Sequence, residues 1–220
     1  MQVPDPSTFR LLVVPGVTMA KWGRMWSERR PGVELLLVPG QAFDPAVADA
    51  GLVRLPVDQD ALHAIPLYTE TTVVVVPREH VLTAADSLTL ADLDGETVLR
   101  PLDDPLDWSP ATVAEHRPDT TATAVELVAA EVGLLVVPQS LARLYHRRDL
   151  TYRPVSDAPT SSVGLVWPRD GHTDLVEEMI GIVRGRTANS TRGRVAEPAA
   201  KKTTPRRAAR PQAPPRRRGR

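Results

Sequence analysis

Short apolar runs that end in proline recur five times along this 220-residue chain. LLVVP occurs at 11–15 and again at 134–138, and related runs are LLLVP at 35–39, VVVVP at 73–77 and GLVWP at 164–168. Each run has the length and β-branched content of a strand, and proline can end a strand without removing a hydrogen bond from its interior. The runs are apolar throughout rather than alternating, which favours strands that are covered on both faces.

Between these runs, apolar residues recur at helical spacing, which predicts helices over 18–30, 121–133, 138–148 and 173–185. Thr18 is the expected N-cap of the first helix. The side chains that we expect to be buried are Trp22, Met25, Trp26, Val125, Leu127, Val128, Val132, Leu175, Met179, Ile180 and Val183. The alternation of strands and helices predicts open, mostly parallel α/β sheets, in which ligands bind beyond the carboxyl ends of the strands.

The composition excludes several kinds of site. Hydrophobic residues make up 42% of the chain, enough for a folded core, but aromatic residues are only 4%, which argues against a stacking platform for single-stranded nucleic acid. The chain has no cysteine, so disulfides and thiolate chemistry are excluded. Neither a signal peptide nor a long apolar segment is evident, and we therefore expect a soluble, cytoplasmic protein without membrane contacts.

The formal net charge of zero conceals an uneven distribution. Residues 187–220 carry 11 Lys/Arg and one acid, whereas residues 1–186 carry 16 basic and 26 acidic residues. The 187–220 segment is rich in Pro, Ala and Arg, which predicts a disordered tail. Such a tail can neutralise phosphates of nucleic acid without reading its sequence, or it can merely keep the protein in solution. The candidate phosphate contacts are Lys201, Lys202, Arg206, Arg207, Arg210, Arg216, Arg217 and Arg218.

Four segments in this order resemble the effector-binding (substrate-binding) domain of LysR-type transcriptional regulators. They are DAGLVRLPVD (49–58), LHAIPLYTETTVVVVPREHVL (62–82), SLTLADLDGETVLRP (87–101) and VELVAAEVGLLVVPQSLARL (125–144). The resemblance covers about 8–186. It implies an α/β, two-lobed, periplasmic-binding-protein-like (type 2) fold, with a five-stranded, mixed and mostly parallel sheet in each lobe and a small ligand in the cleft between them.

The same resemblance implies where the lobes begin and end. Lobe I would comprise about 8–54 and 162–186, and lobe II about 57–160, with the chain crossing the hinge near Arg54–Asp58 and Thr160–Val163. Two departures stand out. Glu131 occupies a position where the family usually has glycine, and no winged helix-turn-helix precedes lobe I in this sequence, so we do not expect direct operator reading by such a motif. Two connecting stretches are also shorter than in the family, which predicts a smaller or remodelled cleft.

Candidate ligand contacts follow from the turns and from the resemblance. The turn after the first LLVVP precedes a helix, whose free N–H groups favour an anion, although simple capping explains the same residues. Arg54 could pair with an acidic ligand or with a surface carboxylate, and Pro101 could line the cleft or only end a strand. The threonines at 120–123 could face the cleft or cap their helix. The resulting candidates are Gly16, Val17, Thr18, Arg54, Pro101, Thr121 and Thr123.

Other chemistry lacks support in the sequence. The five histidines show no metal-ligand spacing, and no serine lies in a GxSxG motif. Asp103, Asp104 and Asp107 are better explained as a hydrated loop than as paired acid and base. We therefore expect no metal, no cofactor and no enzymatic activity.

The leading interpretation is a non-enzymatic sensing domain in transcriptional regulation. It would bind a small metabolite, with an anion favoured, between its two lobes. We expect it to act as a homodimer or as a heterodimer with a full-length regulator. The alternative is an interaction protein, or a protein associated non-specifically with nucleic acid, that acts through its basic tail and has a degenerate cleft.

Overall fold

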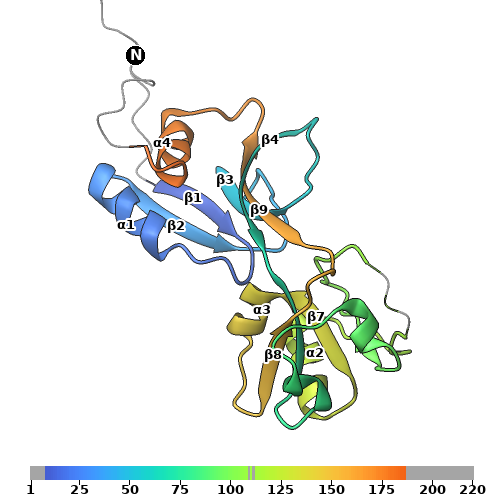
Figure 1. Ribbon diagram of the computed structural model, residues 1–220. Helices are drawn as coiled ribbons and strands as arrows, with labels where there is room; N and C mark the ends of the chain where they lie inside the picture. The colour runs from blue at the N-terminus through green and yellow to red at the C-terminus, as the bar shows by residue number, and fades with distance from the viewer. Residues whose placement is uncertain (1–7, 109, 111, 187–220) are drawn as a thin grey trace, which may run out of the picture. The chain divides into compact units, whose positions relative to one another are not determined.

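Two β-sheets organise the described part of the chain, residues 8–108, 110 and 112–186, in the computed structural model (Figure 1). The first sheet has five strands in the order β2-β1-β3-β9-β4, and the second has four in the order β6-β7-β5-β8. We call the parts built on these sheets lobe I and lobe II. Both belong to one compact unit.

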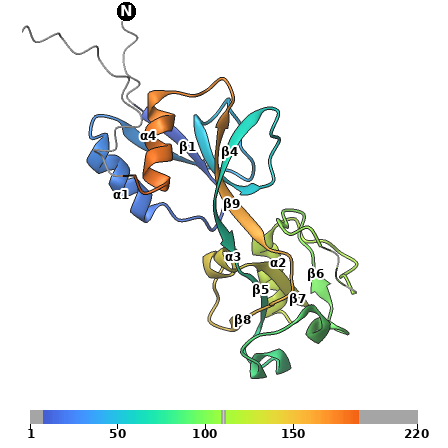
Figure 2. The same ribbon diagram turned by 45° about the horizontal axis from the view of Figure 1, so that its top comes forward.

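Lobe I consists of five strands and two helices. The strands are β1 (Thr8–Val13), β2 (Glu34–Pro39), β3 (Ala50–Leu55), β4 (Leu62–Glu70) and β9 (Ser161–Pro168). β1 pairs in parallel with β2 and β3, whereas β9 lies antiparallel between β3 and β4. The helices α1 (Ala20–Arg29) and α4 (Asp174–Val183) lie side by side over one face of the sheet (Figure 2), and Arg29 pairs with Glu178 at 3.1 Å.

Trp26 anchors α1 to the sheet of lobe I. Its ring stacks on Phe9, with centroids 4.8 Å apart, and its Nε1 donates a hydrogen bond to the Val33 carbonyl at 3.0 Å. An aromatic side chain of this size contributes a large apolar area to a core when its polar atom also has a partner. Trp26, Leu175, Met179 and Ile180 are buried as expected, and Trp22, Met25 and Val183 pack partly buried against the same core.

Lobe II has helices on one face of its sheet and short turns on the other. Its strands are β5 (Thr72–Pro77), β6 (Val98–Leu99), β7 (Leu134–Pro138) and β8 (Leu150–Pro154). The helices α2 (Thr121–Ala129) and α3 (Gln139–Leu144) pack on the face that includes Val73 and Val75. The 3-10 helix η2 (Leu90–Leu93) packs on the face of Val74 and Val76, and a second one, η1 (Val81–Ala84), follows β5.

Four of the five apolar runs lie wholly on strands, including the second LLVVP copy on β7 of lobe II. The first copy lies on β1 of lobe I up to Val13 and continues past its end through Val14 and Pro15. The sheets are mixed, but the expectation that they are mostly parallel is wrong, because four of the seven strand pairs among the described strands are antiparallel. The expectation of five strands in each lobe is also wrong for lobe II, whose sheet has four.

The assignment of all residues from about 57 onward to lobe II is wrong for β4. This strand pairs with β9 from Leu62 to Glu70 and therefore completes the sheet of lobe I. The chain first crosses between the lobes at Glu70–Thr72, where β4 leads into β5, and not near Arg54–Asp58. It returns between Pro154, the last residue of β8, and Ser161, the first of β9.

Helix ends differ from the sequence-based expectation in two places. The N-cap of α1 is Met19, because the first backbone hydrogen bond of the helix runs from the Gly23 N–H to the Met19 carbonyl. No side chain caps this end of the helix. Thr18 is exposed and does not cap the helix. α2 ends at Ala129, and Val132, expected to be buried, is 50% exposed because Glu131 turns the chain with a positive φ of 57°.

Candidate functional site

A polar network occupies the place where the chain first passes from lobe I to lobe II. Arg54 Nε donates to Glu70 Oε2 at 2.8 Å, and Arg54 Nη2 donates to Ser140 Oγ at 3.1 Å. The Ser140 hydroxyl in turn donates to Glu70 Oε1. Arg54 and Glu70 belong to strands of lobe I, whereas Ser140 is on α3 of lobe II. The network therefore links the two lobes through charge-assisted hydrogen bonds.

The segments that follow the two LLVVP copies, a turn at Gly16 and the start of α3, meet at this network. Arg54 Nη2 also donates to the carbonyl of Pro15, the last residue of the first copy, at 3.0 Å. Gly16 follows with a φ of 87°, and a Cβ at this position would lie 2.7 Å from Ser140 Oγ. Only glycine fits here, because the backbone is left-handed and α3 approaches it closely.

A cavity of about 310 Å³ lies beside this network. Its lining comes from both lobes and consists of Val14, Pro15, Gln41, Arg54, Leu55, Pro56, Leu102, Asp103, Asp104, Pro105, Thr121, Leu141 and Tyr145. The volume is at the lower end of the range for small-molecule sites in proteins.

Two carboxylates from lobe II line the cavity. Asp103 Oδ1 accepts hydrogen bonds from the backbone N–H and the hydroxyl of Thr121, at 2.7 and 2.8 Å, and so holds the first turn of α2. Asp104 accepts from the Leu106 N–H at 2.9 Å and from Arg100 Nε at 3.2 Å. Burial nevertheless raises the pKa of Asp104 above its ordinary value, because desolvation of the carboxylate outweighs these hydrogen bonds and the nearby charges of Arg100 and Arg117.

The charges in the lining do not form a simple anion site. Arg54 is its one guanidinium, and Glu70 already neutralises that charge. Asp103 and Asp104 place two acceptors in the same lining. A ligand in this cavity must therefore offer hydrogen-bond donors to the carboxylates, and a bare anion would meet unfavourable potential there.

The structure brings only part of the predicted ligand set to this cavity. Arg54 and Thr121 line it, and Arg54 also forms an ion pair with Glu70 that is buried rather than at the surface. Gly16 is adjacent but outside the lining. The other candidates, Val17, Thr18, Pro101 and Thr123, are also outside it.

Capping of α2 explains the contact made by Thr123, and Pro101 lies just after the end of β6, whereas Thr18 does not cap α1. Thr120 is the N-cap of α2, and its Oγ1 accepts from the Thr123 N–H at 3.1 Å. Thr123 itself is exposed. Pro101 is buried, and its carbonyl accepts from Arg117 Nη2 at 2.9 Å.

Sequence reasoning missed the residues of the cavity that come from loops and from α3. The sequence predicts a hydrated loop for Asp103, Asp104 and Asp107, and this holds for Asp107 alone, since only that residue is exposed. The available signal was position: LDDP follows the strand that ends at Leu99, and polar residues after strand ends are common in α/β ligand sites. Leu141 and Tyr145 gave no sequence signal, because a helix facing a cavity has the same spacing as one facing a core.

Three further predictions concern the basic tail, metal binding and membrane contact. The proposed phosphate contacts from Lys201 to Arg218 lie outside the described residues. Among the described residues, no group of three or more His, Asp or Glu is placed to hold a metal ion. No helix in that same part of the chain has the length and apolar character needed to cross a bilayer.

The chain is similar in sequence to one protein family and to several curated proteins. The family model for the LysR substrate binding domain matches residues 8–188. The chain is 26% identical over 149 residues to the HTH-type transcriptional regulator AlsR of Bacillus subtilis (strain 168), covering 61% of this chain and 48% of AlsR. It is 30% identical over 179 residues to a probable hydrogen peroxide-inducible genes activator of Mycobacterium avium, covering 71% and 57%. The chain thus spans about half the length of the curated relatives it matches.

Solved structures share the fold. The BenM effector binding domain with its effector benzoate has a TM-score of 0.67 and 21% identity, with 81% of this chain and 90% of that one covered. The oxidized form of OxyR has a TM-score of 0.68 and 22% identity, with 82% and 96% covered.

Proposed function

The chain belongs to the LysR substrate binding domain family, and from this premise we propose that it senses a small polar metabolite between its two lobes in the control of transcription. The observation that carries the proposal is the cavity of about 310 Å³ whose lining comes from both lobes. Two facts about similar proteins support it. The curated relatives are transcriptional regulators, and the BenM domain was solved with benzoate as its effector. The protein would act in the cytoplasm, without catalysis.

The response would come from the relative arrangement of the lobes. A ligand that touches Arg54 on one side and Asp103 or Thr121 on the other favours whichever arrangement presents all of these groups at once. The Arg54–Glu70–Ser140 network joins the same two lobes and would oppose or assist that change.

The lining narrows the class of ligand. Asp103 and Asp104 favour hydroxyl or amino donors, while Arg54 Nη1 donates to no acceptor among the described residues. We therefore favour a hydroxy acid or an amino acid over a simple carboxylate. The expectation of an anionic ligand is retained only in this modified form.

Substitution of a single exposed residue tests this proposal. Leu102 lines the cavity but is 61% exposed, so Leu102→Trp should fill the cavity with an indole and leave the core intact. Leu144→Trp is the matched control, since Leu144 is similarly exposed, at 51%, and lines neither this cavity nor the one in lobe II. A panel of hydroxy acids, amino acids and monocarboxylates is screened by thermal shift, and hits are measured by calorimetry.

The proposal requires that at least one compound of the first two classes stabilise the wild-type protein and the Leu144→Trp variant but not the Leu102→Trp variant. It is wrong if no compound stabilises the wild type, or if Leu102→Trp binds the hits as tightly as the wild type does.

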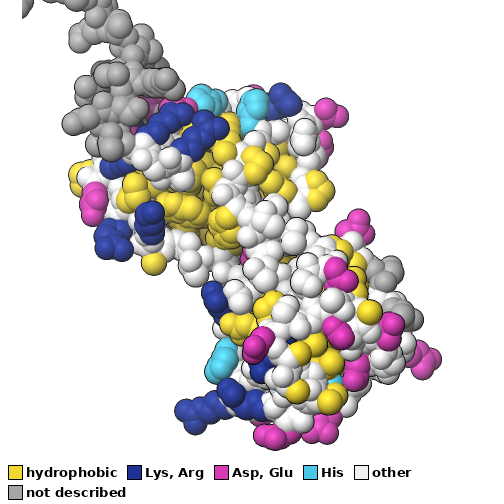
Figure 3. Space-filling model, in the orientation of Figure 1, with side chains coloured by type: hydrophobic (Ala, Val, Ile, Leu, Met, Phe, Trp, Pro, Cys, Tyr) yellow, Lys and Arg dark blue, Asp and Glu magenta, His cyan; other side chains and the backbone are white. Residues whose placement is uncertain are grey.

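We also propose that the domain pairs with a second copy, or with a full-length regulator of its own family, through lobe I. β2 is an edge strand and exposes Leu36 and Leu37, each by nearly half. Hydrophobic side chains are visible over lobe I in Figure 3. Exposed apolar edges of this kind are commonly covered by partners. Sedimentation equilibrium should report a dimer that Leu36→Glu converts to monomer, and a monomeric wild type would contradict a homodimer.

A second function is favoured by one property of the sequence, the concentration of 11 basic residues after position 186. We propose that the 187–220 segment binds nucleic acid through its phosphates. Binding of a random-sequence duplex should fall steeply between about 50 and 200 mM salt and disappear when the chain is truncated after Gly185. Retention of binding by the truncated chain would contradict this function, and ligand binding by the truncated chain would separate it from the sensing function.

A further inference from the structure

A second cavity, of about 270 Å³, lies within lobe II between the sheet and the end of α3. Its lining consists of Val75, Arg78, Val125, Ala142, Tyr145, His146, Arg147, Leu150, Thr151 and Tyr152. All of these residues come from the segments of lobe II, so this cavity is distinct from the one between the lobes. The volume is enough for a molecule with a single ring.

The floor of this cavity is apolar. Val75, Val125, Ala142 and Leu150 are at most 6% exposed and belong to the core between the sheet and the helices α2 and α3. Tyr145 and Tyr152 pack partly buried against the same core. A ligand that binds here would bury its own apolar surface against these side chains. Because the side chains are already ordered in the core, little further entropy is lost on binding.

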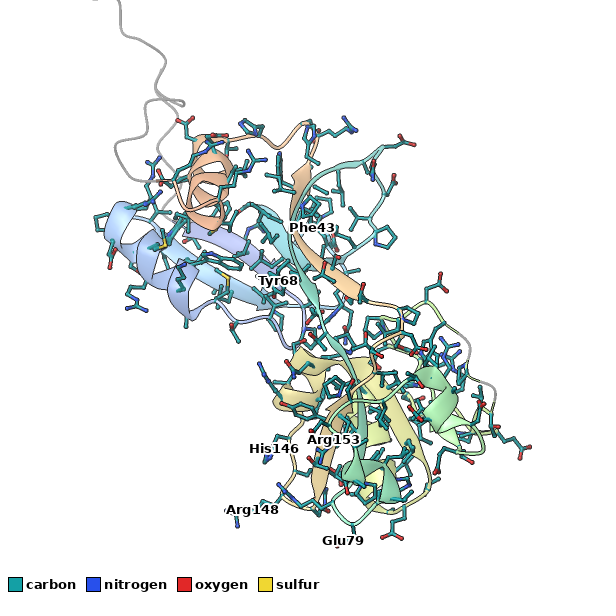
Figure 4. The ribbon with its side chains drawn as sticks, in the orientation of Figure 1. Phe43, Tyr68, Glu79, His146, Arg148 and Arg153 are labelled. Carbon is teal, nitrogen blue, oxygen red and sulfur yellow. The ribbon has the colours of Figure 1, made fainter. Side chains whose placement is uncertain are left out.

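The rim of the cavity is basic. It carries Arg78, His146 and Arg147, and Arg148 follows directly in sequence. Figure 4 places His146 and Arg148 on the same side of lobe II, and Figure 3 shows blue and cyan side chains together at that side.

The basic residues differ in how far their charge is already neutralised. Arg147 is paired with both Glu126 and Asp149, and these hydrogen bonds raise its pKa further, so its charge is retained but compensated. Arg78 uses its Nε to donate to the Arg148 carbonyl at 2.5 Å. Within the part of the chain that the structure describes, no carboxylate lies within 4 Å of the Arg78 or Arg148 guanidinium. Of the two arginines that line the cavity, Arg78 is therefore the one whose charge no carboxylate compensates.

We propose that this cavity is a second ligand site, which binds a small organic anion with an apolar ring or branched chain. The apolar part lies on the floor formed by Val75, Val125 and Leu150, and the carboxylate accepts from the guanidinium of Arg78. The tyrosine hydroxyls offer further hydrogen bonds, and Arg143 Nε holds that of Tyr152 at 3.3 Å. The chemistry is the reverse of that between the lobes, where the lining contains two carboxylates and a neutralised arginine.

We expect a ligand bound at this site to change the shape of the cavity between the lobes through Tyr145. This residue lines both cavities and caps the C-terminus of α3, whose Ser140 belongs to the interlobe network. A ligand against one side of the ring therefore alters the wall of the other cavity. This coupling rests on the proposed sensing function, whereas the second site does not depend on it.

The test uses benzoate as the anion and benzamide as its neutral match, with amide NMR of the full chain to locate binding. Benzoate should shift the amides of Val75, Val76 and Arg78 and those of residues 145–152. Arg78→Gln should weaken this binding about 10-fold or more, as expected for loss of a charged hydrogen bond, and benzamide should be weaker by a similar factor. Arg24→Gln, on α1 of lobe I, is the matched control and should change nothing.

Three results would overturn the second site: no shifts at these amides, equal shifts with benzamide, or unchanged affinity in Arg78→Gln. Leu102→Trp distinguishes the two sites, because filling the cavity between the lobes should leave benzoate binding in lobe II intact even if no effector is ever found. For the coupling, the Thr121 amide should titrate with the same midpoint as the Arg78 amide and shift with it in Arg78→Gln. A separate Thr121 midpoint, unaffected by that variant, would mean direct binding between the lobes and would overturn the coupling.

Discussion

Arg54 and Glu70 form a buried ion pair at the point where the chain leaves lobe I. Their side chains are 11% and 3% exposed, and Nε lies 2.8 Å from Oε2. The two residues lie on β3 and β4, two strands that both pair with β9. Each is thus fixed by a backbone ladder, and the pair is supported further by Ser140 from the other lobe.

Glu70→Gln should lower the free energy of unfolding by about 3 kcal/mol, because removal of one partner leaves the other charge buried and uncompensated. Arg54→Met combined with Glu70→Leu should recover most of this loss. Urea denaturation of Arg54→Met, Glu70→Leu and the double variant measures the coupling. Asp49→Asn is the control: the Arg10–Asp49 pair is more exposed, and its loss should cost no more than about 1 kcal/mol. Equal losses for Glu70→Gln and Asp49→Asn would contradict the special role of burial.

Gly16→Ala and Gly23→Ala should change stability in opposite directions. At Gly16 the added Cβ meets Ser140 Oγ at 2.7 Å and the backbone is left-handed, so the protein should lose about 1–2 kcal/mol or more. Gly23 lies inside α1 with no atom within 4 Å of such a Cβ, and alanine there should add about 0.5–1 kcal/mol. Thermal melts of both variants are sufficient, and a stabilised Gly16→Ala protein would show that the turn is less constrained than described.

Glu131→Gly should stabilise the protein. α2 ends in a Schellman motif, in which the N–H of Val132 donates to the Leu127 carbonyl and that of Glu131 to the Val128 carbonyl. The residue in the left-handed position is Glu131, whereas α4 ends in the same pattern with Gly185 at a φ of 69°.

Relief of the left-handed strain exceeds the extra chain entropy of glycine, so a net gain of about 0.5–1 kcal/mol is expected in chemical denaturation. Glu131→Ala keeps the Cβ and should show no such gain. If glycine and alanine had the same effect, the gain would have to be assigned to loss of the charge.

Stability should depend on pH through Asp104. Burial raises its pKa in the folded protein, so the folded state favours the protonated carboxyl. Its contribution to stability is therefore fully present below the pKa of the unfolded chain and is lost as the pH rises through the folded pKa.

Asp104→Asn does not titrate, so the stability of the wild type relative to this variant should fall as the pH is raised from about 3 toward neutrality. A relative stability that rises with pH would mean that the hydrogen bonds to Asp104 outweigh its desolvation.

Local pattern was enough to locate most of the secondary structure. A continuous apolar run with β-branched residues favours a strand through its own residues, and each of the five runs lies wholly or for its first residues on a strand. The stripe containing Trp26 and that containing Met179 likewise predicted buried helix faces, because helical spacing places these side chains on one side. The order of four short segments was enough to indicate the family.

Most of the elements, most of their buried faces and the two-lobed family fold thus follow from the order of residues along the chain. Tertiary structure alone decided that β4 belongs to lobe I, since its strand partner β9 comes from the far end of the chain and no local pattern specifies that pairing. It also decided that Arg54 is neutralised by Glu70 and that Asp103 and Tyr145 line a cavity. Strand and helix formation depend on neighbours in sequence, whereas the partner of a charge and the exposure of a side chain depend on residues that only folding brings together.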